Sequence, residues 1–227
     1  MNPDNDIRYQ PLYGVSEAAR YVHANNNVLR SWLMGTPSRR NSSILEPATR
    51  KDVDKLSFVN LVEAHMLVAL RTTHKVSMPR IRSATEWLKK ETGNRHPLAE
   101  CLIETDGMDI FVDHLGQLIN ASERGQVFIR GVMERFLHRI ERDENGIPMS
   151  FYPFTRGVAA ECPKDIIMTP EVAFGRPVVA GTRISTQMLI ERFLAGDSVK
   201  TLADDYELKL TLVEEAVRCE LDHLKAA

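Results

Sequence analysis

Residues 174–184 read FGRPVVAGTRI, and residues 196–206 read GDSVKTLADDY. In the first stretch, glycines bracket a short β-prone run, and each glycine permits a tight turn. In the second stretch, a glycine closes one helix and a serine can cap the next. A pair of short strands followed by a small trihelical unit is typical of domains that read DNA or dock onto a partner. The combination indicates regulation rather than catalysis.

The residues around these stretches extend the pattern to the end of the chain. Short β-prone runs lie at residues 166–168 and 177–179. Three residues are positioned to cap helices whose apolar side chains recur at helical spacing: Ser185, Ser198 and Thr211. We therefore expect residues 161–227 to form a C-terminal trihelical domain, similar to a homeodomain in its helix-turn-helix layout.

A second helix-turn-helix layout lies near the N-terminus. A short helix is expected over residues 16–23, and a polar turn rich in Asn follows it. Asn27 can cap a second helix, which Gly35 would end. Residues 36–55 are rich in Pro, Ser and basic residues, and they predict a brief β-hairpin, or wing.

Two longer helices are expected to follow the wing, over residues 58–74 and from Pro79 to Gly93. Their apolar residues recur along one helical face, which is the pattern of a helix packed on a core. Residues 1–95 are therefore predicted to form a winged helix-turn-helix DNA-binding domain.

The middle of the chain, residues 96–160, is predicted to be a connecting α+β segment. Runs at 109–113 and 117–120 predict short strands, and residues 125–142 predict one long helix. A third strand is expected near residues 149–154. The whole chain is thus expected to be mostly α-helical with small β elements.

Composition places the chain among soluble globular proteins. It has 227 residues, of which 43% are hydrophobic and 26% charged. No apolar run approaches the roughly 18 residues that span a bilayer, and the first twenty residues lack the pattern of a secretory signal. The cysteines lie far apart at Cys101, Cys162 and Cys219, which suits a reducing cytosol. We therefore expect no contact with a membrane.

Charge differs between the two parts of the chain. Residues 1–100 hold 15 Lys and Arg against 10 Asp and Glu, whereas residues 101–227 hold 14 against 21. A mildly basic front and an acidic back suggest different partners for each part.

The motifs of common enzymes are missing from the sequence. It contains no His-Glu-x-x-His, no Gly-x-Ser-x-Gly, no phosphate-binding P-loop and no Cys-x-x-Cys. The acidic runs at 106–109 and 143–146 are typical of turns rather than of metal-binding loops. We expect no catalytic residue, no metal and no cofactor, so the chain is not expected to be an enzyme.

Two resemblances cover most of the chain. Residues 14–90 resemble a MerR-like winged helix-turn-helix, through SEAARYV, NNNVLRSW and the basic residues after them. Residues 167–224 resemble a small antitoxin domain long catalogued as a domain of unknown function, through GRPVVAGTRIS, LAGDS and LADDYEL. The order of the two domains is similar to that of VapB-type antitoxins, which pair with PIN-like ribonuclease toxins.

The resemblance implies a cytoplasmic bacterial antitoxin of a type II toxin-antitoxin system. Such a protein binds and silences its toxin and represses its own operon by binding operator double-stranded DNA. We also expect a homodimer, because a two-fold dimer would match a palindromic operator. The alternative is a MerR-like regulator that responds to a small-molecule effector and has no toxin. That protein would need an effector pocket, for which residues 98–160 offer room.

Residues of the second N-terminal helix are the candidates for reading bases. They lie in its N-terminal part: Asn26, Asn27, Arg30 and Ser31. Arg suits guanine and Asn suits adenine through paired hydrogen bonds, although Asn27 could instead act only as the cap. Basic residues of the wing are the candidates for phosphate contacts: Arg39, Arg40, Arg50 and Lys51.

The C-terminal candidates would bind the toxin or form a dimer. They are Arg176, Gly181, Thr182 and Arg183. Glycine would shape the turn, whereas an arginine could enter the carboxylate cluster that the resemblance implies for the toxin's active site. Alternatively, the arginines pair within the chain with acidic residues of the same domain: Asp197, Asp204 or Asp205.

Overall fold

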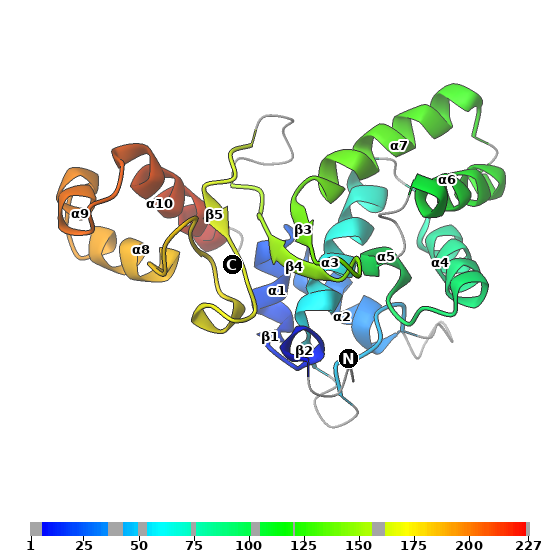
Figure 1. Ribbon diagram of the computed structural model, residues 1–227, viewed down its shortest axis with the longest axis horizontal. Coiled ribbons are helices and arrows are strands. Elements are labelled where there is room, and N and C mark those ends of the chain that lie inside the picture. Colours follow the sequence, from blue (N-terminus) through cyan, green and yellow to red (C-terminus); the bar gives the residue numbers. More distant parts are fainter. Residues whose placement is uncertain are drawn as a thin grey trace. The chain divides into compact units, whose positions relative to one another are not determined.

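The computed structural model describes the following residues: 6–35, 43–49, 54–73, 76–100, 105–119, 121–155 and 162–225. The fold is mostly helical with short strands, as predicted (Figure 1). The chain divides into two compact units, Met1–Met149 and Ser150–Ala227. The finer division into three domains, at residues 95 and 160, stays a prediction.

A two-stranded sheet closes the helix-turn-helix of the first unit. Strand β1 (Tyr13–Gly14) pairs antiparallel with β2 (Lys55–Leu56), so that Tyr13 lies opposite Leu56. Between them come helices α1 (Val15–Tyr21) and α2 (Asn26–Met34), which pack on each other. The chain therefore enters and leaves this segment at neighbouring points.

The cap of helix α2 differs from the prediction. Asn25 is the N-cap, and its side chain accepts a hydrogen bond from the backbone N–H of Asn27 at 2.9 Å. Asn27 lies inside the helix, so its expected capping role was wrong. In a run of three asparagines, each can cap, and burial of Leu29, Trp32 and Leu33 fixes the register. Gly35 ends the helix with a φ of 73°, as predicted.

The predicted wing falls largely on residues outside the described part of the chain. Residues 43–49 are described and contain no strand, and β2 pairs with β1 rather than with a wing partner. The backbone N–H groups of Ile44 and Leu45 donate to the carbonyl oxygen of Trp32 at 2.8 and 3.0 Å. This segment is therefore tied to the end of helix α2.

Helix α3 (Phe58–Val68) is the centre of the first unit, since all 11 of its residues are buried. Ser57 caps it in a capping box, in which the Ser57 and Asn60 side chains each bond to the other's backbone N–H. A π-helical turn, η4 (Ala69–Thr73), continues α3, and helix α4 (Met78–Thr92) follows. Gly93 ends α4 in the left-handed conformation, as predicted.

The strands predicted at 109–113 and 117–120 are wrong, because residues 109–119 belong to one helix, α6 (Thr105–Ile119). Its buried side chains recur at helical rather than strand spacing: Met108, Phe111, Val112 and Leu115. Helix α5 (Pro97–Glu100) precedes α6, which packs against α4 and against α7 (Glu123–Leu137) (Figure 1).

The long helix predicted over residues 125–142 ends earlier than expected, at Leu137. Strand β3 (Ile140–Arg142) follows and pairs with β4 (Pro148–Phe151), which matches the expected third strand. The second unit begins within β4.

Short strands and helices form the second unit. Strands β5 (Ile166–Ile167) and β6 (Val178–Val179) lie in the two runs predicted to be β-prone, and they pair antiparallel. Helices α8 (Thr186–Leu194), α9 (Val199–Asp205) and α10 (Leu210–Lys225) follow.

Local signals set the starts of the first two of these helices. The hydroxyls of Ser185 and Ser198 accept from the backbone N–H of Met188 and Thr201, as a helix cap does. Helix α10 instead begins before Thr211, which therefore does not cap it. Apolar side chains from the three helices and β6 meet in one core: Val179, Leu189, Leu202, Val213 and Ala216. Among the described residues, no helix is long and apolar enough to cross a bilayer.

Candidate functional site

Helix α2 buries one face and presents the other to solvent. Leu29, Trp32 and Leu33 are buried against the rest of the first unit. The predicted base-reading residues Asn26, Asn27 and Arg30 are exposed on the opposite side. An exposed polar face at the N-terminal half of a firmly packed helix is what the second helix of a helix-turn-helix needs to reach base edges.

Ser31 is the exception among the predicted DNA-contacting residues of α2. Its side chain is half-buried, and its hydroxyl donates to the carbonyl oxygen of Val28 at 2.7 Å. A hydroxyl bonded within its own helix is less available to a base than the neighbouring amide and guanidinium groups. Ser31 remains a predicted contact, with the weakest geometry of the four.

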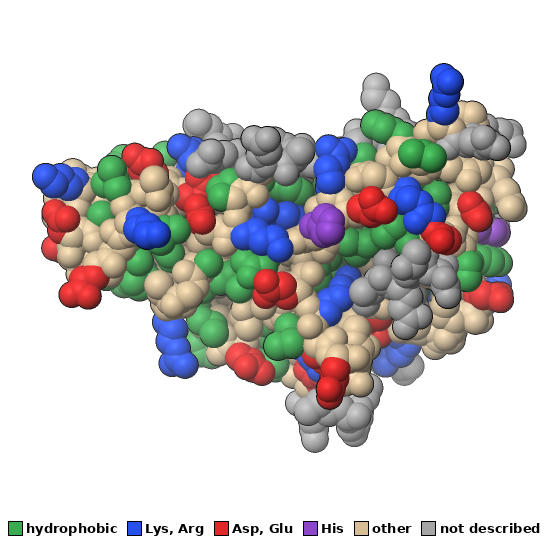
Figure 2. Space-filling view, turned by 45° about the horizontal axis from the view of Figure 1, so that its top comes forward, with side chains coloured by type: hydrophobic (Ala, Val, Ile, Leu, Met, Phe, Trp, Pro, Cys, Tyr) green, Lys and Arg blue, Asp and Glu red, His purple; other side chains and the backbone are tan. Residues whose placement is uncertain are grey.

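The predicted phosphate contacts Arg39, Arg40, Arg50 and Lys51 lie outside the described residues. In Figure 2, Lys and Arg side chains are interspersed with Asp and Glu side chains over the visible face. Charge alone therefore does not mark a DNA-binding surface on the part of that face that is described. The position of α2 and the exposure of its polar side chains identify the candidate interface instead.

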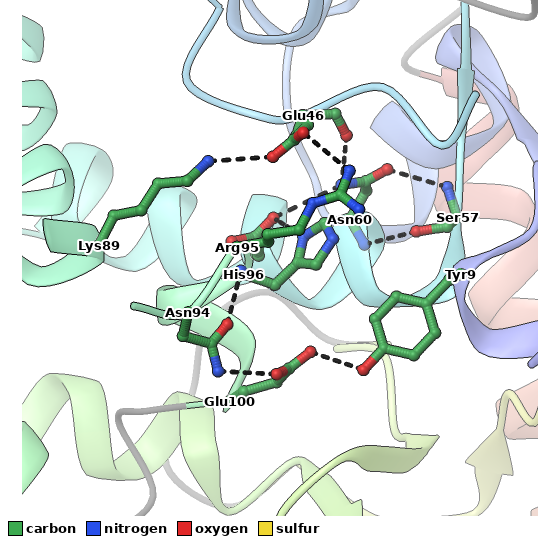
Figure 3. A network of polar contacts seen from close by, with 10 residues as sticks. Tyr9, Glu46, Ser57, Asn60, Lys89, Asn94, Arg95, His96 and Glu100 are labelled. Atoms are coloured by element: carbon green, nitrogen blue, oxygen red, sulfur yellow. Dashed lines mark hydrogen bonds and ion pairs between the residues drawn. The ribbon is translucent and has the colours of Figure 1, made fainter. Parts of the chain in front are cut away.

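A polar network supports the segment that follows α2 (Figure 3). Glu46 accepts from Lys89 at 3.0 Å and from Arg95 at 2.8 Å, and its backbone carbonyl accepts from the buried Asn60 at 2.9 Å. Burial opposes ionisation of Glu46, but the bonds from Arg95 and Lys89 outweigh it and lower the pKa of its carboxyl to about 2. The network joins residues 43–49 to helices α3 and α4.

A buried ion pair lies beneath this network. Nδ1 of His96 is 3.0 Å from the carboxylate of Glu63, and both residues are buried. Burial by itself would lower the pKa of His96, but the charge and hydrogen bond of Glu63 raise it overall. Because the pair is enclosed, it offers no access for a substrate, and its geometry is that of a structural contact between α3 and the chain before α5.

The second unit presents a strained turn. Ala173, Phe174 and Gly175 have φ values of 49°, 54° and 77°, a left-handed run that non-glycine residues seldom adopt. The Phe174 side chain is 78% exposed, the largest exposure among the exposed apolar side chains of the described residues. Backbone strain that persists in a folded structure is a marker of functional segments.

The predicted C-terminal residues fall into two kinds. Gly181 has a φ of 78°, and the Thr182 hydroxyl donates to the carbonyl oxygen of Val179 at 2.8 Å while accepting from the Ile184 N–H at 3.1 Å. These two residues build the turn. Arg176 and Arg183 are exposed on either side of β6 in the sequence, and they are the side chains that can contact a partner.

The acidic residues proposed as internal partners are largely engaged elsewhere. Arg192 donates to Asp197 and to Asp205, at 2.6 Å in each case. Asp204 is exposed. Arg192, which sequence analysis did not single out, thus takes two of the three carboxylates that were considered for Arg176 and Arg183.

The described residues contain no group of three His, Cys, Asp or Glu side chains close enough to hold a metal ion. That finding concerns the described part of the chain alone, and the expectation that the protein needs neither metal nor cofactor stays a prediction.

Models of known families match both ends of the chain. Residues 11–85 match a family described as "Putative DNA-binding HTH domain". Residues 166–218 match a family described as "Protein of unknown function (DUF433)". The first match contains β1, α1, α2, β2 and α3. The second contains β5, β6, α8, α9 and the first part of α10.

A curated protein of Mycobacterium tuberculosis (strain ATCC 25618 / H37Rv) matches along most of the chain. It is named "Putative antitoxin VapB45" and is 28% identical over 225 residues, which cover 88% of this chain and 90% of that protein. The chain is thus similar, along most of its length, to a protein that is named as a putative VapB antitoxin. The resemblance expected from the sequence is thereby confirmed, together with its helix-turn-helix domain.

A crystal structure shares the fold of this chain. It is described as that of Rv2018 from Mycobacterium tuberculosis, and it superposes with a TM-score of 0.69 at 23% sequence identity. The match covers 92% of this chain and 97% of the other. The arrangement of elements described above therefore also occurs in an experimental structure.

The sequence did not reveal Phe174 as a surface feature. The glycine at position 175 indicated a turn, but nothing in the sequence indicated that the two residues before it are also left-handed. Phenylalanine is commonly buried, so its exposure here could not be expected from residue type. The only available signal was its place beside the glycine of the family motif.

Proposed function

We propose that the chain is an antitoxin that binds and neutralises a PIN-like ribonuclease toxin and represses its own operon by binding operator DNA. The observation that carries the DNA-binding half is the exposed face of helix α2, with Asn26, Asn27 and Arg30, inside a domain that matches a DNA-binding family. The toxin-binding half is supported by homology to a protein named as an antitoxin. The chain has no reaction of its own in this role.

Helix α2 would enter the major groove of the operator. There Arg30 can donate two hydrogen bonds to a guanine, and the amides of Asn26 and Asn27 can pair with adenine. The buried face of α2 and the contacts of residues 44 and 45 with Trp32 hold the helix in place. A homodimer would present two such helices to a palindromic site.

Replacing Arg30 with alanine is expected to weaken operator binding by about 1–3 kcal/mol, because a bidentate base contact is lost. Replacing Arg39 with alanine should instead make the affinity less dependent on salt. The slope of log affinity against log salt concentration should fall by the amount that about one phosphate contact contributes. Fluorescence anisotropy with the DNA upstream of the chain's own gene, titrated over several salt concentrations, measures both effects. Arg135→Ala is the matched control, since Arg135 is exposed on helix α7. Unchanged affinity and salt slope in both test variants would reject the assignment.

The toxin would contact the part of the second unit that holds Arg176 and Arg183. PIN-like nucleases, which the resemblance implies as partners, carry a cluster of carboxylates in the active site. An exposed arginine could enter this cluster and form charge-assisted hydrogen bonds, which would block access to the metal-binding carboxylates. Arg176, which directly follows the strained turn, and Arg183 are both exposed and are the candidates for this role.

Reversing the charge in Arg183→Glu is expected to weaken the toxin complex by at least a hundredfold, or about 3 kcal/mol, since it puts a carboxylate against carboxylates. Titration calorimetry with the product of the neighbouring reading frame measures the effect. Lys200→Glu, an exposed charge reversal on helix α9, is the control. Sedimentation of the free chain distinguishes the alternative role: a dimer lost in Arg183→Glu, with toxin affinity unchanged, would place this residue in the dimer interface.

A further inference from the structure

An exposed aromatic side chain lies on the turn before strand β6. Phe174 is 78% exposed, whereas Gly175 and Pro177, which follow it, are buried. A single exposed apolar side chain is ordinary in itself, so the backbone that carries the ring decides whether it has a role. The family match over residues 166–218 describes no function and therefore assigns none to Phe174.

The backbone of Phe174 is strained. Its φ of 54° and ψ of 39° lie in the left-handed α region, in which the Cβ atom crowds the following carbonyl oxygen. Ala173, directly before it, also has a positive φ, of 49°. Glycine would adopt both conformations without this cost in free energy. Phe174 thus combines a strained backbone with an exposed ring, and neither feature favours folding of the free chain.

Hydrogen bonds hold the strained turn in one conformation. The backbone N–H of Gly175 donates to the carbonyl oxygen of Val172 at 2.9 Å, and that of Arg176 donates to Ala173 at 3.1 Å. Burial of Pro177 and the pairing of β6 with β5 fix the chain directly after the turn. The ring is therefore held on a rigid backbone, and a partner that encloses it has little backbone freedom to remove.

The charge next to the ring indicates the chemistry of that partner. Arg176 is exposed two residues after Phe174. An aromatic ring supplies a large apolar contact, and an arginine forms charge-assisted hydrogen bonds with carboxylates. Aromatic residues and arginine are also enriched at the centres of protein interfaces. The complementary surface is an apolar pocket that has carboxylates at its edge.

A second copy of the chain and DNA fit this turn less well. About a two-fold axis through the turn, Arg176 would face its own copy, and the like charges would repel. Asp and Glu outnumber Lys and Arg in the second unit, by 12 against 9, which disfavours contact with phosphates. A different protein with an acidic surface fits both the ring and the charge beside it.

We propose that Phe174 anchors the toxin: its ring enters an apolar pocket beside the carboxylate cluster, and Arg176 pairs with a carboxylate at the edge of that pocket. The inference rests on the proposed antitoxin function and adds an apolar anchor to the arginine contacts of the same region. The strain in the turn is the loss of stability that comes with holding the ring in the solvent.

Titration calorimetry of the full chain with the product of the neighbouring reading frame tests the anchor. Phe174→Ala is expected to weaken the complex by about thirtyfold or more, the loss that marks an interface hot spot. Leu194→Ala is the matched control and should leave the affinity unchanged. Leu194 is 62% exposed at the C-terminal end of α8, whereas Thr186, at the N-terminal end, bonds to Pro177.

The same titration separates failure of the anchor from failure of the proposed function. Toxin binding that is as tight in Phe174→Ala as in the unaltered chain keeps the toxin as a partner and overturns the anchor. Absence of binding by the unaltered chain rejects the antitoxin function, and the anchor falls with it.

Phe174→Gly separates a binding role from a structural one. Glycine removes both the ring and the strain, so this variant should bind the toxin as weakly as Phe174→Ala does. Amide hydrogen exchange at the buried Ala216, in the middle of α10, should be no faster than in the unaltered chain. Faster exchange in both variants would show that the ring supports the fold, and would overturn the proposal.

Two further measurements test the other occupants. Phe174→Ala should leave the operator affinity unchanged in fluorescence anisotropy, and it should leave the mass of the free chain unchanged in sedimentation. Loss of operator binding, or dissociation of a dimer, with the toxin affinity unchanged, would assign the ring to DNA or to a second copy and overturn the proposal.

Discussion

Replacing Phe136 with alanine is expected to lower the free energy of unfolding of the first unit by about 3–5 kcal/mol. The Phe136 side chain is 1% exposed, and its ring centre lies 4.5 Å from that of His65 in the fully buried helix α3. Removing the ring leaves a cavity between α7 and α3, which pack against each other. The cost includes both the lost burial and the cavity.

Urea denaturation followed by tryptophan fluorescence measures this loss. The chain has 2 tryptophans, Trp32 and Trp87, and both belong to the first unit, so the signal reports that unit rather than the other. Val127→Ala is the matched control, because Val127 lies on the same helix and is 69% exposed. The control should change the free energy of unfolding by no more than about 0.5 kcal/mol. Equal effects of the two substitutions would contradict the packing of α7 described above.

Acidification is expected to destabilise the first unit through His65. Burial lowers the pKa of His65 to about 3, although the carbonyl oxygen of Phe136, which accepts from its Nε2 at 3.2 Å, works in the opposite direction. His65 is therefore neutral when folded, whereas it titrates near pH 6.5 when unfolded. The unfolded chain binds the extra proton. The contribution of His65 to the free energy of unfolding is therefore fully present above about pH 6.5 and is lost as the pH falls toward 3.

The expected loss is on the order of several kcal/mol over that pH range, since each unit of pKa shift corresponds to about 1.4 kcal/mol. His65→Gln keeps a hydrogen-bond donor and removes the titrating group. The free energy of unfolding of this variant should therefore fall less steeply as the pH is lowered, because about one proton fewer is taken up on unfolding. His138→Gln, which alters an exposed histidine, should keep the slope of the unaltered protein. Parallel pH profiles for the unaltered protein and His65→Gln would contradict the burial of a neutral imidazole.

His96 contributes with the opposite sign. Its pKa is raised in the folded protein by Glu63, so its contribution to stability is present below about pH 6.5 and is lost as the pH rises through the folded-state pKa. The two buried histidines, His65 in α3 and His96 just before α5, therefore stabilise the fold at different pH: His65 at high pH and His96 at low pH. The sequence alone does not show which of the two has the raised pKa.

Local signals in the sequence predicted much of the fold. The capping serines at positions 57, 185 and 198 begin helices as expected, because their hydroxyls act on backbone N–H groups only three residues away. The glycines at positions 35 and 93 end helices for an equally local reason, since each adopts a positive φ. Such interactions require no knowledge of the rest of the chain.

Elements decided by distant contacts were predicted less well. The runs at 109–113 and 117–120 have apolar residues compatible with either a strand or a helix, and packing against α4 and α7 selects the helix. The candidate site also depends on packing. Exposure of Asn26 and Arg30 follows from which residues of α2 are buried, and their contact with DNA stays a prediction.

The short pairing of β1 with β2 has an evolutionary consequence. Because Tyr13 and Leu56 are neighbours across the sheet, the chain enters and leaves residues 15–54 at a single place. Within that segment, Leu29, Trp32 and Leu33 are buried and hold α2 on the rest of the first unit. Recognition can therefore diverge at the exposed positions of α2, such as Asn26 and Arg30, while the buried face that seats the helix is inherited unchanged.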